Sequence, residues 1–320
     1  MTLRRRDLLA LSLAPLLSPL ALAQDRFPSK AIDVIVPWGP GGGADVLGRI
    51  LARWFETDLK VSAPVMNIPG ASGMIGLGKM SQAAADGHTV AILTGDSLMM
   101  AATASPAFRM NEAVSLGVLV RQPSGIFAPS NSRYKSWQDV VNAVRAKPGE
   151  VSLAITGPNT ADDLTAQYLA SKQVVLGGVP YTKPGERYAA VLGGHVDLLY
   201  EQAGDLRSFL ESGQLKPLIF FAPKRLAAPF GSVPVSAEFG YEVLLPQVRA
   251  VLAKVGTDPQ RLQLLAASVE RFSQSSEYKK FIEQQLALPD SFIASKPADA
   301  FLQVELEASR KLLAAYGAKS

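Results

Sequence analysis

The residues best suited to chemistry lie in a glycine-rich stretch near the start of the chain. The β-branched run Ile32 to Val36 precedes Trp38-Gly39-Pro40-Gly41-Gly42-Gly43-Ala44-Asp45, and apolar residues at helical spacing follow it. We therefore expect a strand, a glycine loop and a helix in succession, with Asp45 as the helix N-cap. Because backbone N–H groups at a helix N-terminus attract anions, this loop predicts a site for a carboxylate or a phosphate.

The loop also matches the glycine spacing of dinucleotide-binding proteins, from Gly39 to Ala44. Pro40 is unusual inside that motif, and the next strand does not end in a clear acidic residue. The Gly-Lys-Ser/Thr ending of a P-loop is also missing. A nucleotide site is therefore disfavoured, and we expect no cofactor.

Catalytic arrangements find little support. Ser72 lacks the second glycine of a nucleophile elbow, and His88 and His195, the two histidines of the chain, both lie in expected turns. No group of histidines, cysteines and carboxylates has the spacing of metal ligands. We therefore predict a binding protein rather than an enzyme, with no catalytic residue and no metal.

The elements that must position these residues alternate along the chain. A second glycine loop, Pro69 to Gly73, follows Val65-Met66-Asn67 and leads into a helical stretch through Ala85. Further strands are predicted at 89–93, 151–155, 196–200 and 215–221, and further helices at 162–171, 259–286 and 297–316. This order indicates an α/β fold with mainly parallel sheets, whose ligands bind beyond the carboxyl ends of the strands.

Three groups of residues have two interpretations each. Trp38 is either a buried anchor or the floor of a ligand cleft. Asp162-Asp163 is better explained as helix capping than as a pair of acids, because adjacent helical residues point apart. Lys183 and Arg187 either lie in a solvated loop or act as charge partners for an acidic ligand.

The N-terminus has the pattern of an export signal. Three arginines, Arg4 to Arg6, precede the apolar run Leu8 to Ala23, which ends in Ala21-Leu22-Ala23 and is too short to span a membrane comfortably. We expect a signal peptide at 1–23 with cleavage after Ala23, and Arg5-Arg6 suits the twin-arginine pathway as well as the Sec pathway. The mature chain would then be periplasmic.

Composition narrows the function further. Removing the three arginines and Asp7 lowers the net charge from +4 to +2, and the remaining basic residues are scattered, so no nucleic-acid partner is expected. The chain has no cysteine, so neither a disulfide nor a lipid anchor is predicted. With apolar residues at 48% and 320 residues in all, it is long enough for two domains.

Several ordered motifs resemble the Bug family, the solute receptors of tripartite tricarboxylate transporters. The motifs are the stretches at 27–45, 67–76, 86–89, 179–181 and 192–197. The resemblance implies a type II periplasmic-binding-protein fold, in which two lobes joined by a two-crossover hinge close on a ligand. The first lobe would hold 24–121 and 224–320, and the second 122–223, with the crossovers near 118–122 and 221–225.

The resemblance also implies the binding site. The first glycine loop would face the loop Thr156 to Ala161, with Thr160 supplying a hydroxyl. The remaining candidates are Ala71, Ser72, Thr94, Asp96, Ser97, Asn159, Tyr181, Lys183 and Glu201. The implied function is capture of a small carboxylate by a monomer, followed by delivery to membrane transporter subunits. Delivery of a signal to a membrane sensor is the alternative.

The chain departs from the family pattern at several of these positions. Ala44 stands where many relatives have threonine, Ile68 replaces arginine and Met74 replaces asparagine. The stretch 156–163 also lacks the common glycine-serine and histidine pattern. These changes leave the expected fold intact and allow a less typical ligand.

Overall fold

A computed structural model describes residues 27–103, 106–243 and 245–317. The predicted signal peptide and its cleavage after Ala23 lie outside these ranges. Within them, no helix combines the length and the apolar character that a membrane crossing requires.

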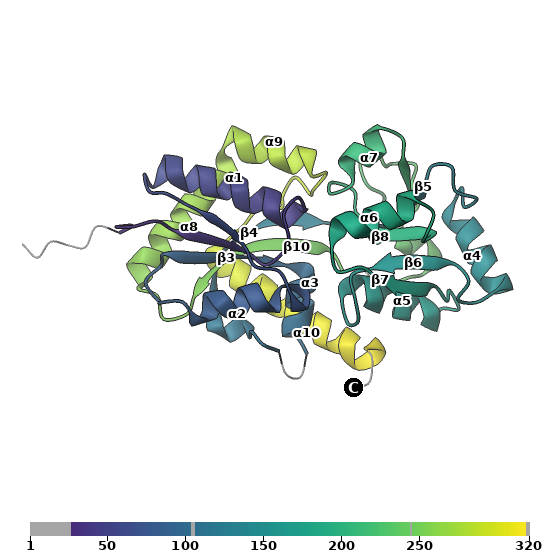
Figure 1. Cartoon of the computed structure of the whole chain (residues 1–320), viewed down its shortest axis with the longest axis horizontal. Helices are drawn as coiled ribbons and strands as arrows, with labels where there is room; N and C mark the ends of the chain where they lie inside the picture. The colour runs from purple at the N-terminus through teal and green to yellow at the C-terminus, as the bar shows by residue number, and fades with distance from the viewer. Residues whose placement is uncertain (1–26, 104–105, 244, 318–320) are drawn as a thin grey trace, which may run out of the picture.

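Two sheets organise the chain into two lobes (Figure 1). The sheet of the first lobe consists, in spatial order, of β11 (Ile293–Ala294), β4 (Ala113–Gln122), β10 (Gln247–Lys254), β3 (Thr89–Thr94), β1 (Asp33–Val36) and β2 (Val65–Asn67). The sheet of the second lobe consists of β7 (Gly177–Pro180), β6 (Ser152–Ile155), β8 (Leu198–Gln202), β5 (Ser124–Pro129) and β9 (Leu215–Phe220).

Helices cover both faces of each sheet. Those of the first lobe are α1 (Gly43–Asp58), α2 (Met74–Gln82), α3 (Gly95–Ala101), α8 (Pro259–Gln274), α9 (Ser276–Gln284) and α10 (Ser295–Tyr316). Those of the second lobe are α4 (Trp137–Ala146), α5 (Ala161–Ser171), α6 (Pro184–Leu192) and α7 (Arg207–Glu211). Short 3₁₀ turns lie at Ala71–Gly73, Met110–Glu112 and Ser236–Phe239. The α/β expectation is confirmed.

Alternation along the strands divides the core of the first lobe into two layers. Val34 and Val36 of β1 pack with α1 and α8 on one face, while Ile35 packs with α2, α3 and α10 on the other. In α1, Leu47 and Phe55 are fully buried at helical spacing. Burial of each such side chain contributes about 1.5–3 kcal/mol, which makes this face the main reason that α1 forms against the sheet.

Both sheets are mixed, so the expectation of mainly parallel sheets was wrong. The pairs of β1 with β2 and β3, and of β6 with β7 and β8, are parallel. The pairs that involve β4, β5, β9 and β10 are antiparallel. The difference arises because the chain leaves the first lobe through β4 and returns through β10, and these two strands lie beside each other in opposite directions.

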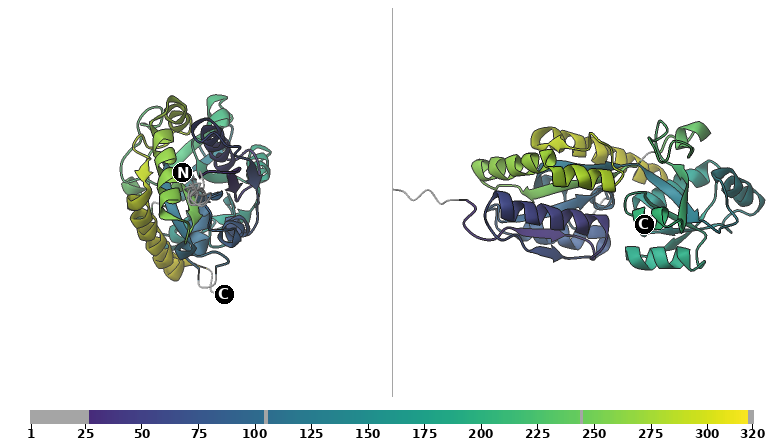
Figure 2. Two further views of the ribbon diagram at one scale, coloured as in Figure 1. Left: turned by 90° about the vertical axis from the view of Figure 1, so that its left-hand side faces the viewer. Right: turned by 90° about the horizontal axis from the view of Figure 1, so that it is seen from above.

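The crossovers between the lobes lie side by side. The first passes through Pro123, between β4 and β5. The hydroxyl of Ser124 donates to the carbonyl of Leu245, at the point where the chain returns to β10, at 3.1 Å. The view from above in Figure 2 shows these connections along one side of the molecule. The type II fold with two lobes and two crossovers agrees with the expectation.

The second crossover lies later than predicted. Residues 224–243 were assigned to the first lobe, but Phe230, Val235, Tyr241 and Val243 pack into the core of the second lobe. The chain therefore returns between Val243 and Gln247 rather than at 221–225. The cause is tertiary, because this irregular stretch has no periodicity that would assign it to either sheet.

The remaining differences concern helix boundaries. The helix predicted at 259–286 is interrupted at Ser275, whose backbone is extended and whose hydroxyl accepts the N–H of Tyr278 at 3.1 Å. The helix predicted through Ala85 ends at Gln82. The C-terminal helix α10 packs on the first lobe and reaches the second, where the rings of Tyr316 and Tyr168 lie 5.6 Å apart.

Candidate functional site

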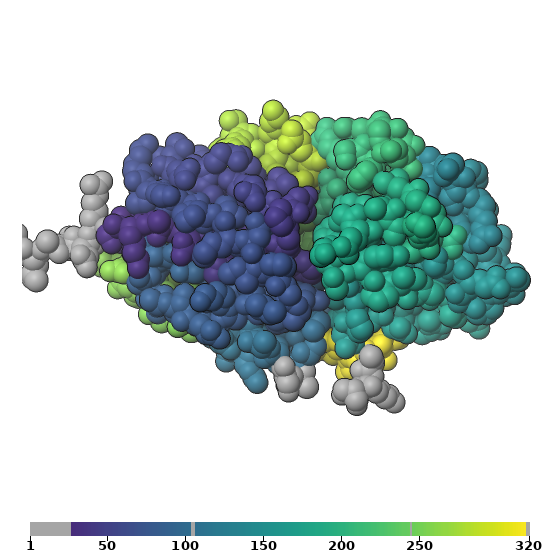
Figure 3. Space-filling view, in the orientation of Figure 1, coloured from purple at the N-terminus to yellow at the C-terminus, as the bar shows by residue number. Residues whose placement is uncertain are grey.

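Two adjoining cavities lie between the lobes. They comprise about 300 and 450 Å³ of space, part of it continuous with solvent, and are walled by residues of both lobes. The residues common to the two cavities are Asp96, Thr156, Arg187, Glu201, Gln202 and Gln247. In the space-filling view the lobes meet along a narrow seam, where the start of α1 faces α6 (Figure 3). A cleft between two lobes with several convergent polar side chains is a usual place for a small solute to bind.

The first glycine loop lines the larger cavity. Gly42, Gly43 and Ala44 all belong to its wall, at the point where α1 begins. The N-cap is Gly42, which offers no side-chain capping bond, so backbone N–H groups at the first turn of α1 remain available. The sequence predicts an anion site at such a helix terminus, and the structure places this terminus at the wall of the cavity. Gly39 and Gly41 do not line either cavity.

Asp45 holds this loop in shape instead of capping the helix, so the N-cap prediction was wrong. Its carboxylate accepts the N–H of Gly41 at 3.0 Å, the Nε of Arg49 at 2.9 Å and the Nδ2 of Asn67 at 2.9 Å. Burial acts to raise the pKa of Asp45, but these hydrogen bonds outweigh it and the pKa is lowered. Asp45 is buried and does not contact the cavities.

Trp38 combines both interpretations offered for it. Its ring packs partly against the core of the first lobe and also lines the larger cavity. The indole Nε1 donates to the hydroxyl of Thr94 at 3.1 Å, and Thr94 caps α3 by accepting the N–H of Ser97 at 3.3 Å. Thr94 lines the same cavity. Trp38 and α3 are thus fixed relative to each other.

The second glycine loop lies outside the cavity walls and contacts the start of α3. Ala71 and Ser72 have positive φ values of 47° and 50°, and the carbonyl of Ser72 accepts the hydroxyl of Ser97 at 3.0 Å. Ser97 is fully buried. None of these three residues lines the two cavities. Their contacts instead fix the start of α3, which carries Asp96 into the cleft.

In the second lobe, the loop before α5 contributes Thr156 and Ala161 to the cavity walls. Thr160 is fully buried, and its hydroxyl contacts the carboxylate of Asp162 and the carbonyl of Gly157. Asn159 lies outside both walls, and its N–H is accepted by Asp163 at 2.8 Å. The carboxylates of Asp162 and Asp163 therefore hold the loop before α5 in shape by accepting its backbone N–H groups. The N-cap of α5 is Thr160, which has no side-chain capping bond, so the capping interpretation was wrong.

Arg187 lies in a helix and not in a solvated loop. It belongs to α6, is 6% exposed and lines both cavities. Its guanidinium forms an ion pair with Glu201 and donates to the hydroxyl of Thr156 at 2.6 Å. Burial acts to lower the pKa of Arg187, but Glu201 outweighs it and the pKa is raised. The hydroxyl of Tyr188 also donates to Glu201, at 3.0 Å.

Two other predicted site residues lie away from the cavities. The side chain of Lys183 is 74% exposed and pairs with Glu186 at 2.8 Å. Tyr181 packs against the core of the second lobe. Neither residue belongs to the wall of the cleft, whereas Glu201 does. His88 and His195 are also outside the walls, and the described residues contain no group of three or more acids or histidines that could hold a metal ion.

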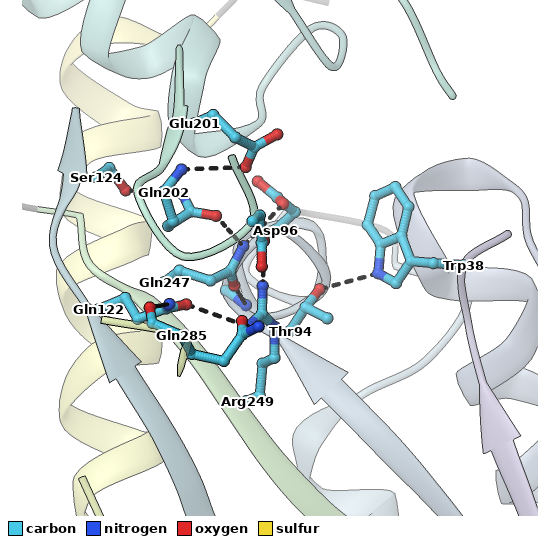
Figure 4. A network of polar contacts seen from close by, with 12 residues as sticks. Trp38, Thr94, Asp96, Gln122, Ser124, Glu201, Gln202, Gln247, Arg249 and Gln285 are labelled. Carbon is cyan, nitrogen blue, oxygen red and sulfur yellow. Dashed lines mark hydrogen bonds and ion pairs between the residues drawn. The ribbon is translucent and has the colours of Figure 1, made fainter. Parts of the chain in front are cut away.

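A polar network joins the lobes across the cleft (Figure 4). Arg249 of β10 forms an ion pair with Asp205, which follows β8, and both side chains are at least 93% buried, being 2% and 7% exposed. Arg249 also donates to Gln122 and Gln285 at 3.1 Å each. Gln247 lies between Asp96 and Gln202, with both contacts at 3.5 Å. These contacts hold the lobes together around the cavities.

Sequence reasoning missed several residues of this network, including Gln202, Asp205, Gln247 and Arg249. Arg249 had a signal of its own, because it interrupts the apolar run Val248 to Ala253 of a strand that becomes buried. A single charged side chain in a buried strand is costly unless an opposite charge pairs with it, so this arginine predicts a carboxylate partner. Asp205 had no comparable signal, because it lies in an irregular turn after β8.

Two α/β lobes, two adjacent crossovers and a polar cleft between them define a solute-binding protein. Residues 48–317 match the sequence profile of TctC, the tripartite tricarboxylate transporter family receptors. The chain therefore belongs to this family, and the resemblance to Bug proteins is confirmed. BugT of Bordetella pertussis is 29% identical over 275 residues, which cover 84% of each chain.

Solved structures agree with the fold. A Rhodopseudomonas palustris protein with adipate has a TM-score of 0.82 at 21% identity, and covers 90% of this chain and 97% of its own. MatC from Rhodopseudomonas palustris with bound malate has a TM-score of 0.79 at 20% identity, and covers 90% and 100%. Both comparisons confirm the two-lobed architecture.

Proposed function

We propose that the chain captures a small solute with a carboxylate group in the cleft between its lobes and delivers it to the membrane subunits of a tripartite tricarboxylate transporter. The observation that carries this proposal is the pair of cavities enclosed by both lobes, with the glycine loop at the start of α1 in one wall. Family membership and the acids bound by two proteins of the same fold support it.

In this proposal the carboxylate of the solute binds near Gly42, Gly43 and Ala44. The N–H groups of a helix N-terminus lie at this wall of the larger cavity, and the helix dipole favours a negative charge there. Trp38 and Thr94 form the adjacent surface. Thr156, Ala161 and Glu201 contribute the opposite wall. Binding needs no covalent step, so no catalytic residue and no cofactor is proposed.

The proposal extends to the whole mature protein. We propose a periplasmic monomer released by cleavage after Ala23, through either the twin-arginine or the Sec pathway. Its first lobe comprises 24–121 and the stretch from 247 to the C-terminus, and its second lobe runs from 124 to 243. Closure of one lobe on the other, through contacts such as the ion pair between Arg249 and Asp205, would present the loaded form to the membrane subunits.

A thermal-shift screen of the mature chain, Gln24 to Ser320, tests the proposal. The panel contains mono-, di- and tricarboxylates, aromatic acids, amino acids and neutral sugars. A solute at a thousand times its Kd adds about 4 kcal/mol of stability, which raises Tm by several degrees in a chain of this size. Stabilisation by acids supports the proposal. If no acid raises Tm of folded protein freed of co-purified ligand, the proposal is wrong.

A further inference from the structure

The charged groups that line the cleft are unevenly balanced. The two cavities are walled by the four carboxylates of Asp96, Asp162, Glu201 and Asp205 and by the two guanidinium groups of Arg187 and Arg249. Carboxylates therefore outnumber cationic side chains by two. A solute that brings only negative charge would enter a site that already has an excess of it.

Both guanidinium groups already have carboxylate partners. Arg187 pairs with Glu201, and Arg249 pairs with Asp205. All four side chains are at least 93% buried, with exposures of 7%, 7%, 2% and 7%. Neither arginine is therefore a spare cation for an acidic solute, in contrast with the charge partner that the sequence offered at Arg187.

Asp96 and Asp162 are the two carboxylates of the cleft that form no ion pair with an arginine, and Asp96 has the weaker hydrogen bonding of the two. The carboxylate of Asp96 accepts a hydrogen bond from the Nε2 of Gln247 at 3.5 Å, which is the outer limit for such a bond. Among the residues that the structure describes, no lysine or arginine forms an ion pair with it. Asp162, by comparison, accepts the N–H groups of Thr156 and Asp163. Figure 4 shows Asp96 in the middle of the network, close to Glu201 and Gln247. A donor is therefore missing on the cavity side of Asp96.

A second group in the same cavity also lacks a partner. Tyr200 is 4% exposed and lines the smaller cavity together with Asp96. Its hydroxyl lies near the hydroxyls of Ser124 and Thr165, but it forms no hydrogen bond of good geometry in the described part of the chain. Because a buried hydroxyl without a partner costs free energy, the arrangement points to a polar group supplied from outside the protein.

We propose that the solute carries a protonated nitrogen, such as an amino group, which binds the carboxylate of Asp96 with the hydroxyl of Tyr200 beside it. The cleft then prefers amino-bearing carboxylic acids to plain di- and tricarboxylates. This inference rests on the proposed function, because it names the class of solute for the same cleft. The amino group faces the acidic side of the cleft, and the carboxylate faces the start of α1.

Protonation of Asp96 agrees with this arrangement. Burial raises the pKa of Asp96 to about 7 in the ligand-free protein. Among the charged groups that face it, Asp162 of α5 and Glu201 of β8 add to the rise, and Arg187 of α6 opposes it. A bound ammonium group favours the ionised carboxylate and therefore releases a proton. A plain carboxylate would instead bind the protonated form and take up a proton.

The experiment measures affinity by titration calorimetry with acids that differ by one amino group. The pairs are glutarate with glutamate, adipate with 2-aminoadipate, and valerate with norvaline, and n-butylamine is added as an amine without a carboxylate. Each binding solute is titrated at pH 6 and pH 8 in buffers of different ionisation enthalpy. We expect amino-bearing members to bind tighter, to release protons, and to gain about tenfold in affinity between pH 6 and 8.

The variant Asp96→Asn keeps the shape of the side chain and removes its charge. We expect it to lose roughly 30-fold or more in affinity for the amino-bearing solute, since it removes one partner of a buried charge pair. The control is Asp299→Asn, which makes the same change at a partly buried carboxylate of α10 outside the cavity walls, where Asp299 accepts the N–H of Ser115. Thermal unfolding of both variants confirms that they fold.

The outcomes separate this inference from the proposed function. Preference for plain acids, with proton uptake and undiminished affinity in Asp96→Asn, would overturn the inference and leave the proposed function standing. Binding of n-butylamine without any acid would support the nitrogen site and contradict the carboxylate part of the proposed function. If no compound binds folded, ligand-free protein, both are wrong.

Discussion

The two walls of the cleft differ in how they present charge. The first lobe contributes Asp96 and Arg249, one charge of each sign, together with backbone N–H groups at the start of α1. The second lobe contributes three carboxylates and one arginine. The excess of carboxylates therefore lies on the second wall. The first wall combines the N–H groups at the start of α1, which suit an anion, with the carboxylate of Asp96, which is close enough to Asp162 and Glu201 of the second wall to feel their charge. The following predictions test this contrast, from the largest expected effect to the smallest.

The largest effect is expected within the charged wall. Arg187→Gln leaves Glu201 buried beside Tyr188 without its cation, and breaking such a pair costs about 3–5 kcal/mol of unfolding free energy. Urea unfolding followed by tryptophan fluorescence measures it. The matched control is Arg207→Gln, whose pair with Glu211 is exposed, with side-chain exposures of 39% and 61%, and is expected to change stability by about 0–1 kcal/mol.

The contact between the walls depends on a glycine. A Cβ at Gly43 would lie 2.3 Å from both the Nη2 of Arg249 and the Oδ1 of Asp205, so Gly43→Ala should prevent the two lobes from closing on this pair. Such overpacking costs about 1–3 kcal/mol, which corresponds to a loss of roughly 5- to 150-fold in ligand affinity.

The ligand-free Gly43→Ala protein should lose less stability than affinity, because its lobes can separate to relieve the contact and alanine favours the first turn of α1. Gly185→Ala is the control, since Gly185 lies in the first turn of α6 with nothing within 4 Å of the added Cβ. Unchanged affinity in Gly43→Ala would mean that the lobes do not bind ligand in this closed arrangement.

Asp96 should make the ligand-free protein less stable as the pH rises. Its pKa is about 7 in the folded state, above the ordinary value of 3.8, so the folded state holds the proton more tightly. The associated stability is present below about pH 4 and is lost as the pH rises through 7. We expect Asp96→Asn to gain about 1–3 kcal/mol over the wild type between pH 5 and 8. A constant difference in Tm between the two proteins across this range would contradict the assignment.

Asp45 should behave in the opposite way. Its pKa is lowered, so the stability that it contributes is present above the ordinary value of 3.8 and is lost as the pH falls below it. Asp45→Ala removes the acceptor of Gly41, Arg49 and Asn67, and should cost about 1–3 kcal/mol at pH 7. It should also weaken ligand binding, because the loop at the wall of the cavity loses its shape. Calorimetry and thermal unfolding at pH 7 and pH 3 measure both effects.

The smallest effect is expected at Lys183. The exposed side chain lies outside both cavity walls, and its ion pair with Glu186 is solvated. Lys183→Ala should change stability and affinity by less than about 0.5 kcal/mol. A large loss of affinity would show that the second wall extends to this residue and would restore the role that sequence analysis gave it.

Local patterns explain what could be predicted. The run Ile32 to Val36 alternates between two core layers, and Leu47 to Phe55 repeats at helical spacing, so the strand, loop and helix at the first glycine loop follow from neighbouring residues alone. The loop of Trp38 to Ala44, which helps to line the cleft, could be predicted for the same reason. Family motifs extended this to the two-lobed fold.

The positions of residues that depend on partners distant in sequence were harder to predict. Lys183 and Arg187 are close in sequence, but only Arg187 points into the cleft, because α6 buries one of its faces against the sheet. The stretch 224–243 was assigned to the wrong lobe, since its apolar residues have no period that selects a sheet. Local sequence contains no information that separates these alternatives.

The sequence by itself determined the α/β elements, the anion-friendly loop at the start of α1 and the family. Tertiary structure alone decided the electrostatic character of the cleft. Arg249 meets Asp205 across the two lobes, and Asp96 is left without a cation, although these residues are separated by 44 and more positions along the chain. Charge balance in a buried cleft depends on which side chains the fold brings together and removes from water, and spacing along the chain does not specify that.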